Sequence, residues 1–185
     1  MNLKLLLLLP LVLFCCMHKT RDGATPATAQ SAVVSDTIPG KRNPYYSRTD
    51  TTALRLSDDE WKKVLPDDIF QIARNKDTER AFTGKYWNYT GRGTYYCAAC
   101  GNKLFKSDAK FASDCGWPSF FEEDRKNSVH YTEDNSFGME RIEVLCGRCR
   151  GHLGHLFDDG PPPTGKRFCM NSVVLEFVPE LGASN

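Results

Sequence analysis

The sequence predicts a mainly β fold that is built from antiparallel sheets, with short helices before them and a metal site between distant strands. Short strand-like segments follow one another from residue 94 to residue 178, and Gly, Asn and Pro separate them. No helical stretch alternates with these segments, which argues against a parallel sheet of βαβ units. Two Cys-x-x-Cys motifs lie far apart in the chain, where a shared metal ion would join remote strands.

The first 16 residues have the pattern of an export signal. Lys4 is followed by an apolar run from Leu5 to Phe14, which is too short for a membrane span of roughly 20 residues. Cys15 and Cys16 then resemble the acylated cysteine of a bacterial lipoprotein, although Gly, Ala or Ser usually precedes that cysteine. We therefore expect export to the cell envelope or periplasm, with a lipid on one of these cysteines. A plainly cleaved signal and an uncleaved anchor are the alternatives.

Residues 17–54 are rich in Thr, Ala, Ser, Pro and charged residues and have no apolar periodicity, which predicts a flexible linker. We expect the folded domain at residues 55–180 and a short tail at residues 181–185. The length of 185 residues suits one domain with such extensions. The 24 basic and 23 acidic residues nearly balance, so the composition does not indicate nucleic-acid binding.

Two short helices are predicted at the start of the domain. Ser57 and Glu60 have the spacing of a capping box, and Trp61 and Leu65 can form one apolar stripe behind them. Pro66 can begin a second helix whose apolar residues are Ile69, Phe70, Ile72 and Ala73. We expect both helices to cover one side of the domain.

Strand patterns follow after residue 93. Residues 94–96, 103–105 and 110–111 are short apolar pieces between turn residues. In residues 139–145, Ile142 and Val144 alternate with Arg141 and Glu143, as expected for a strand with two different faces. Residues 173–178 alternate in the same way.

The two Cys-x-x-Cys motifs, Cys97 with Cys100 and Cys146 with Cys149, predict a structural zinc site. Four thiolates suit tetrahedral zinc, and nearby glycines, Gly101 and Gly147, suit the tight turns of such sites. Two alternatives remain. Either pair could be a redox dithiol, or the cysteines could form disulfides in an oxidising compartment.

Two further cysteines, Cys115 and Cys169, have no neighbour at metal-ligand spacing. Arg167 precedes Cys169 by two residues and could stabilise its thiolate, which is the nucleophilic form of cysteine. We interpret Cys169 as an attacking cysteine and Cys115 as its resolving partner. A static disulfide or two buried thiols would be the structural alternative.

Two histidines, His152 and His155, lie close before Cys169 in the sequence and could move protons. On a regular strand a separation of three residues would place them on opposite faces, whereas a bulge at Gly154 would bring both to one face. Three aromatic residues could wall an apolar pocket beside them: Trp117, Phe157 and Phe168.

Taken together, these motifs resemble the methionine-R-sulfoxide reductase B family. The resemblance covers roughly residues 57–179, and several segments in the same order are more specific than any one motif. The matching segments are residues 78–87, the two Cys-x-x-Cys motifs, residues 115–120, 152–157, 159–165 and 167–171.

The resemblance implies two packed antiparallel sheets of the β-tent type and an enzyme that reduces the R epimer of methionine sulfoxide, mainly in proteins. It implies Cys169 as the nucleophile and Cys115 as the resolving cysteine, with a thioredoxin-like reductant. Residues that match the family's positions around the sulfoxide oxygen are His152, His155, Arg167 and Asn171. Trp117 matches the residue that receives the substrate methyl group, and the zinc site is structural in this family.

Two positions depart from the family pattern. Asp114 replaces a small residue before Cys115, and Phe168 stands where tyrosine is common. We expect a monomer. Two other functions are considered: a zinc-stabilised binding module without activity, and a general thiol–disulfide oxidoreductase. The first leaves Cys115 and Cys169 unexplained, and the second would require both in one Cys-x-x-Cys motif.

Overall fold

The structure is a computed structural model that describes residues 43–181. The export signal and acylated cysteine expected at residues 1–16, the linker up to residue 42 and the tail from residue 182 lie outside the described residues. None of the helices within residues 43–181 is long and apolar enough to cross a membrane.

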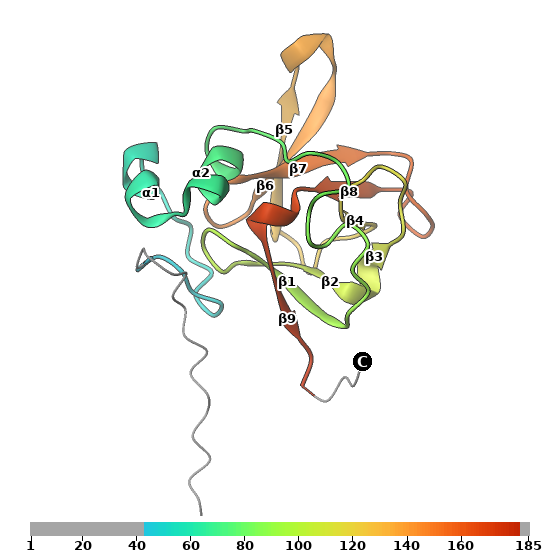
Figure 1. Cartoon of the computed structure of the whole chain (residues 1–185), viewed down its shortest axis with the longest axis horizontal. Helices are drawn as coiled ribbons and strands as arrows, with labels where there is room; N and C mark the ends of the chain where they lie inside the picture. Colours follow the sequence, from blue (N-terminus) through green and yellow to red (C-terminus); the bar gives the residue numbers. More distant parts are fainter. Residues whose placement is uncertain (1–42, 182–185) are drawn as a thin grey trace, which may run out of the picture. The chain divides into compact units, whose positions relative to one another are not determined.

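The two predicted helices are present at the start of the domain. Helix α1 covers Asp58–Val64 and helix α2 covers Asp67–Ala73. The capping box is confirmed, because the Glu60 amide donates to the Ser57 hydroxyl and the Glu60 carboxylate accepts from the Ser57 amide. Both helices lie on one side of the sheets, and α2 packs against β7 (His152–Phe157) and the 3₁₀ turn η3 (Ser172–Val174) (Figure 1).

The strands form two antiparallel sheets, so the predicted mainly β fold is confirmed. The smaller sheet has the order β2-β1-β9, and the larger has the order β3-β4-β8-β7-β6-β5. The strands other than β7 are β1 (Gly93–Cys97), β2 (Lys103–Lys106), β3 (Lys110–Phe111), β4 (Ser119–Phe120), β5 (Val129–Asp134), β6 (Arg141–Cys146), β8 (Arg167–Met170) and β9 (Leu175–Pro179). Two more 3₁₀ turns are η1 (Ser107–Ala109) and η2 (Ser136–Gly138).

Aromatic side chains from both sheets form the core between them. Phe105 of β2 stacks on Phe120 of β4 with ring centroids 4.3 Å apart, and Tyr95 of β1 meets Phe120 edge to face at 5.0 Å. Phe168 of β8 joins this cluster at 5.6 Å from Phe105. The side chain of Phe168 is therefore a core residue, and it does not lie in the pocket where the sequence placed it.

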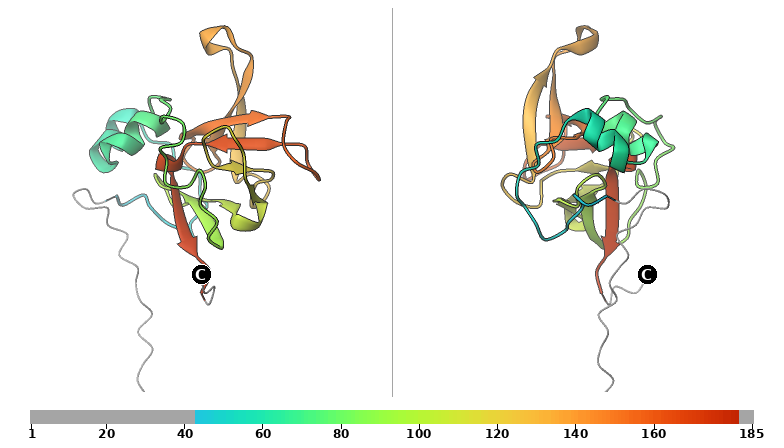
Figure 2. Two further views of the ribbon diagram at one scale, coloured as in Figure 1. Left: turned by 45° about the vertical axis from the view of Figure 1, so that its right-hand side comes forward. Right: turned by 90° about the vertical axis from the view of Figure 1, so that its left-hand side faces the viewer.

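The alternating segments differ from their predictions at two places. Residues 172–174 form the 3₁₀ turn η3, so β9 begins only at Leu175. On β6, Ile142 is 38% exposed, whereas Glu143 on the polar face is 2% exposed. The cause is that β5 and β6 project beyond their neighbours as a hairpin with η2 at its tip, and Ile142 lies toward that tip (Figures 1 and 2).

Residues 43–54, here called the N-terminal arm, pack against the domain although the sequence predicts a flexible linker up to residue 54. Arg148 is 3% exposed and donates to the carbonyls of Tyr45 and Thr52 at 2.9 and 3.2 Å. It also forms an ion pair with Asp50 at 2.8 Å. Backbone hydrogen bonds, one buried arginine and the side chains of Tyr45 and Leu54 hold the arm. Contacts of this kind produce no apolar periodicity in the sequence.

Candidate active site and metal site

The side chains of the larger sheet that could take part in a reaction lie in one row of cross-strand neighbours. Cys169 on β8 pairs with Ser119 on β4 and with His155 on β7, and His155 pairs with Glu143 on β6. Directly opposite residues of antiparallel strands point to the same face with Cβ atoms about 4.5–5.5 Å apart. The sheet register therefore brings a thiol, an imidazole and a carboxylate together from three separate strands.

A β-bulge places both histidines on this face. Val144 pairs with Gly154 but Leu145 pairs with His152, so Leu153 is the extra residue of β7. The rings of His152 and His155 are 5.4 Å apart between their centroids. The sequence predicted a bulge at Gly154. The structure confirms a bulge in β7 and places it at the preceding residue, Leu153.

Gly154 is required because β7 and β8 approach closely at this point. A Cβ atom on residue 154 would lie 2.0 Å from the Cys169 carbonyl oxygen. We expect Gly154→Ala to reduce the free energy of unfolding by about 2 kcal/mol or more, because the backbone of β8 would have to move. Urea unfolding monitored by circular dichroism measures this effect.

Gly151→Ala is the matched control, because its added Cβ atom would meet the nearest neighbouring atoms only at 3.4 Å, close to ordinary contact. Equal stability of the two variants would contradict the role assigned to Gly154.

The two remaining cysteines lie side by side, with the Sγ atoms of Cys115 and Cys169 3.5 Å apart. Both side chains are partly accessible. The hydrogen bond from Cys169 lowers the pKa of the Cys115 thiol to about 4, and the same contact raises the pKa of Cys169. Within this pair the first proton leaves easily and the second is retained, because one thiolate is stabilised by the other thiol. The pair thus holds a thiolate at neutral pH.

Arg167 lies beside this cysteine pair and is held in place by Asp159. Its Nε and Nη2 atoms each donate to the Asp159 carboxylate at 2.8 Å, and its guanidinium lies over the Phe157 ring at 4.3 Å. The Asp159 hydrogen bonds raise the pKa of Arg167, and its charge opposes the rise in the pKa of Cys169. The arginine therefore supports negative charge at the Cys169 sulfur.

A pocket of about 130 Å³ opens onto Cys169. Trp117 forms one wall, and its Nε1 donates to the Glu79 carbonyl at 3.1 Å. Asn171 accepts from the Glu79 amide at 3.0 Å and donates to the Leu153 carbonyl at 3.1 Å, so its amide group is fixed. The other lining residues are Thr78, Arg141, Gly154, His155, Phe157 and Met170. Such a pocket suits a small, partly apolar group with a polar atom.

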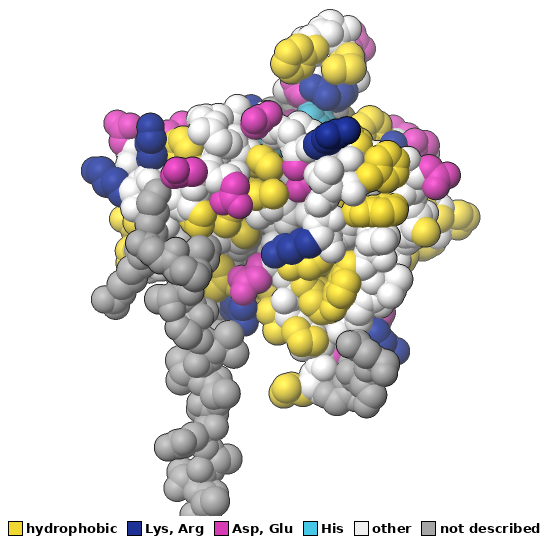
Figure 3. Space-filling view, viewed as in Figure 1, with side chains coloured by type: hydrophobic (Ala, Val, Ile, Leu, Met, Phe, Trp, Pro, Cys, Tyr) yellow, Lys and Arg dark blue, Asp and Glu magenta, His cyan; other side chains and the backbone are white. Residues whose placement is uncertain are grey.

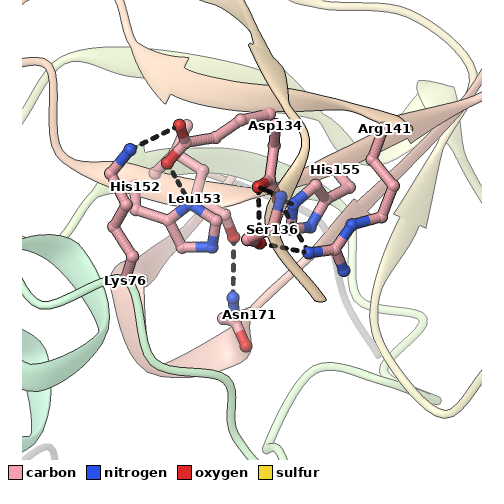
Figure 4. A network of polar contacts seen from close by, with 9 residues as sticks. Lys76, Asp134, Ser136, Arg141, His152, Leu153, His155 and Asn171 are labelled. Atoms are coloured by element: carbon pink, nitrogen blue, oxygen red, sulfur yellow. Dashed lines mark hydrogen bonds and ion pairs between the residues drawn. The ribbon is translucent and has the colours of Figure 1, made fainter. Parts of the chain in front are cut away.

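Each histidine is paired with a carboxylate that the sequence analysis did not identify (Figure 4). His155 Nε2 lies 2.7 Å from Asp134, which also bonds Ser136 and Arg141. These partners come from the projecting hairpin, where Asp134 and Arg141 are opposite each other. Ser136 lowers the pKa of the Asp134 carboxyl, which keeps that carboxylate charged beside His155. The sequence gives only one indication of these partners of His155. Asp134 lies shortly before a turn, and Arg141 lies shortly after it.

His152 lies deeper and does not line the pocket. Its Nδ1 is 2.7 Å from Glu143 Oε1, and Lys76 donates to Glu143 Oε2 at 2.8 Å. Burial lowers the pKa of His152, so the ring is neutral near pH 7. The structure therefore brings together Cys115, Cys169, Trp117, His155, Arg167 and Asn171, with His152 directly behind them.

The four cysteines of the Cys-x-x-Cys motifs form a second, separate cluster that could hold a metal ion. Their buried Sγ atoms all lie within 4.8 Å of one another. Cys97 and Cys149 are 3.8 Å apart, and Cys100 and Cys146 are 3.6 Å apart. Tetrahedral zinc with Zn–S bonds of about 2.3 Å requires S–S separations of about 3.8 Å. The cluster fits a zinc ion, whereas a disulfide requires about 2.05 Å.

Each motif forms the same backbone turn around this cluster. The amide of Gly101 donates to the Cys97 carbonyl, and the amide of Arg150 donates to the Cys146 carbonyl. Both donors have positive φ, +79° for Gly101 and +60° for Arg150, so a non-glycine residue takes the position in the second turn. Gly147 serves another purpose, because a Cβ atom there would lie 2.0 Å from the Asn127 carbonyl.

Exposed hydrophobic side chains gather on the tip of the projecting β5–β6 hairpin, next to a histidine and a basic side chain (Figure 3). Phe137 is 90% exposed and Met139 is 45% exposed. Arg141 and His155 connect this hairpin to the pocket. A protein chain that enters the pocket would therefore meet apolar surface beside it.

Comparisons with known proteins agree with this geometry. The SelR domain model matches residues 65–179. A peptide methionine sulfoxide reductase MsrB of Methanosarcina barkeri is 52% identical over 128 residues, which cover 69% of this chain and 90% of that protein. The MsrB of Leptospira interrogans is 52% identical over 127 residues, which cover 69% of this chain and 97% of that protein. The MsrB of Thiobacillus denitrificans is 51% identical, with 67% and 94% covered.

Proposed function

The chain belongs to the SelR domain family, the methionine-R-sulfoxide reductase B proteins, and from this premise we propose that it reduces the R epimer of methionine sulfoxide, mainly in proteins. The observation that carries the proposal is the Cys115–Cys169 pair, 3.5 Å apart, at a pocket walled by Trp117. An aromatic wall suits the methyl group of methionine, and the polar side chains that line the same pocket suit the sulfoxide oxygen.

In the first step the proton that the two sulfurs share passes to Cys115, and the Cys169 thiolate attacks the sulfur of the sulfoxide. A proton is delivered to the oxygen, which passes from the substrate sulfur to the Cys169 sulfur. The transient sulfur–sulfur bond breaks, methionine leaves, and Cys169 is left as a sulfenic acid. His155 is our candidate for the proton donor, because it pairs with Cys169 across the strands and lines the pocket. Arg167 supports the charge on sulfur beforehand.

In the second step the Cys115 sulfur attacks the sulfenic acid, water leaves, and a disulfide forms. The two Sγ atoms need to approach by only about 1.5 Å to reach the bond length of about 2.05 Å. An external dithiol of the thioredoxin type then reduces the disulfide and regenerates both thiols. Two electrons from that dithiol thus reduce one sulfoxide to methionine and water.

The reaction is tested with the reduced protein and peptides that contain the separate R and S epimers of methionine sulfoxide. We expect one methionine per protein from the R epimer without added reductant, with the loss of two thiols. Chromatography of the peptide and thiol titration give the two numbers. Methionine formed from the S epimer alone, or without loss of thiols, would contradict the proposal.

Cys115→Ser separates the two steps. We expect it to retain about one turnover, because Cys169 and the pocket remain, and to lose cycling with thioredoxin at least about 100-fold, because no disulfide can form. The measurement compares a single turnover with thioredoxin-coupled NADPH oxidation. Normal cycling of the variant would show that Cys115 is not the resolving cysteine.

The four-cysteine cluster is proposed to hold one structural zinc ion per chain. It lies outside the Cys169 pocket and shares no residue with it. Zinc would join β1 and β6 through thiolates, and no step of the reaction passes through it. Residues 1–16 lead us to propose export to the cell envelope, with a lipid on Cys15 or Cys16. We further propose that the folded domain is a monomer. The intact mass of the native protein reports lipid and metal together.

A further inference from the structure

The buried carboxylate of Glu143 has two partners that do not touch the substrate pocket. One oxygen accepts from Lys76 at 2.8 Å, and the other lies 2.7 Å from His152 Nδ1. The side chains of Glu143 and His152 are each 3% exposed, whereas that of Lys76 is 62% exposed. A chain of contacts thus runs from the protein surface to an imidazole behind the reactive row (Figure 4).

The second nitrogen of His152 is left without a partner among the described residues. Nε2 is buried and makes no hydrogen bond, and the ring points toward the side of Asn171 and Leu153 (Figure 4). A buried polar atom without a partner costs about 1–3 kcal/mol. Such an atom in a native protein requires an explanation, and a bound molecule or water that supplies the missing partner is one.

We infer that Glu143 is a positioning residue for the reaction: together with Lys76 it fixes His152 as the Nδ1–H tautomer, so that Nε2 presents a lone pair toward the site. The inference rests on the proposed function. A carboxylate is only an acceptor, so the proton shared with Glu143 must sit on Nδ1 of the neutral ring. The hydroxyl of the Cys169 sulfenic acid, or a water beside it, is the kind of donor that this lone pair would accept.

Glu143→Gln tests the tautomer because glutamine has one oxygen where glutamate has two. The Lys76 ammonium, which has only donors, takes that oxygen, and the amide nitrogen then faces His152 and donates to Nδ1. The proton of the ring must move to Nε2. We expect this variant to lose about 100-fold or more in the rate of the first turnover, with little change in KM.

A second substitution provides a rescue. In Glu143→Gln with Lys76→Met, no ammonium competes for the amide oxygen, so the side chain can turn and accept from Nδ1 again. The nitrogen would then face the surface, where water reaches it beside the exposed position 76. We expect the double variant to recover the Nδ1–H tautomer and most of the lost rate, although it lacks two native side chains.

The tautomer is read directly from long-range 1H–15N NMR spectra of the histidine rings, without substrate. The protein as isolated should have an unprotonated Nε2 at His152, assigned with His152→Gln. Glu143→Gln should exchange the two nitrogen signals, and the double variant should restore them. If Glu143→Gln keeps the native tautomer, or if the double variant is as slow as the single one, the inference is wrong.

Lys76→Met alone provides a test of the contact chain that does not require Glu143→Gln to fold. Three charged or titratable groups face His152: Glu143 of β6, His155 of β7 and Lys76 after α2. The positive charge of Lys76 lowers the pKa of His152, so its removal should move the NMR titration midpoint of His152 to higher pH. Lys106→Met removes an exposed lysine of the other sheet and should leave the midpoint unchanged.

An unchanged midpoint in Lys76→Met would overturn the contact chain. The NMR results do not depend on turnover. The positioning role can therefore fail in an active reductase, and the proposed function can fail in a protein with the expected tautomer.

Discussion

We expect Cys169→Ser to abolish the reduction of methionine sulfoxide, including the first turnover. Serine keeps the size and position of the side chain, but its hydroxyl is neutral at pH 7 and has no accessible oxidised form that could carry the oxygen. Loss of a covalent nucleophile lowers the rate by at least about 1,000-fold. The measurement is methionine formed per protein from an R-sulfoxide peptide under single-turnover conditions.

Cys115→Ser is the matched control, because it removes the other thiol of the same contact and should still form about one methionine. The two variants should have similar free energies of unfolding, because both cysteines are partly accessible and neither belongs to the four-cysteine cluster. Methionine formation by Cys169→Ser would refute the assignment of the nucleophile. Loss of the first turnover in both variants would mean that the two sulfurs act as one unit.

Loss of the proposed zinc ion is the second change with a large expected effect. Binding of structural zinc by four thiolates contributes about 10–16 kcal/mol, which matches or exceeds the whole stability of a typical domain, about 5–15 kcal/mol. We expect Cys100→Ser, or a strong chelator, to unfold the domain at 25 °C. The cluster joins β1 and β6, which belong to different sheets, so its loss separates the two halves of the core.

Circular dichroism and zinc content measured on the same samples check this expectation. Asn102 donates to Cys146 Sγ at 3.6 Å, and Asn102→Asp should weaken metal binding without removing a ligand. A folded Cys100→Ser variant that contains no metal would contradict a structural role for the cluster.

The sequence predicts the local features of this fold well because each has a local cause. The capping box of Ser57, the two metal turns and the alternating strands depend on residues within a few positions of one another. The sequence predicts His152 and His155 on one face of the sheet only if the strand contains a bulge, and the strand register confirms this bulge. Phe168 was misplaced because its aromatic character fits a pocket and a core equally well.

The supporting residues could not be predicted because their partners are remote in the sequence. Glu143 looks like an outward residue of an alternating strand, and only the neighbouring strand shows that it is buried against His152. Asp134 reaches His155 from the hairpin, across 21 positions. Contacts of this kind depend on the sheet register, which a single sequence does not encode in any short motif.

Arg148 sets a limit on where this domain can be cut or fused. The sequence would suggest residue 55 as the first residue of an isolated domain, but that choice removes Tyr45, Asp50 and Thr52, which surround the guanidinium. Only the Cys100 carbonyl would remain as a partner of this buried guanidinium, and breaking a buried ion pair by removing one member costs about 3–5 kcal/mol. Arg148 belongs to the same turn as Cys146 and Cys149. Loss of its partners would therefore destabilise the turn that carries these two candidate zinc ligands. An affinity tag or fusion partner therefore belongs before residue 43.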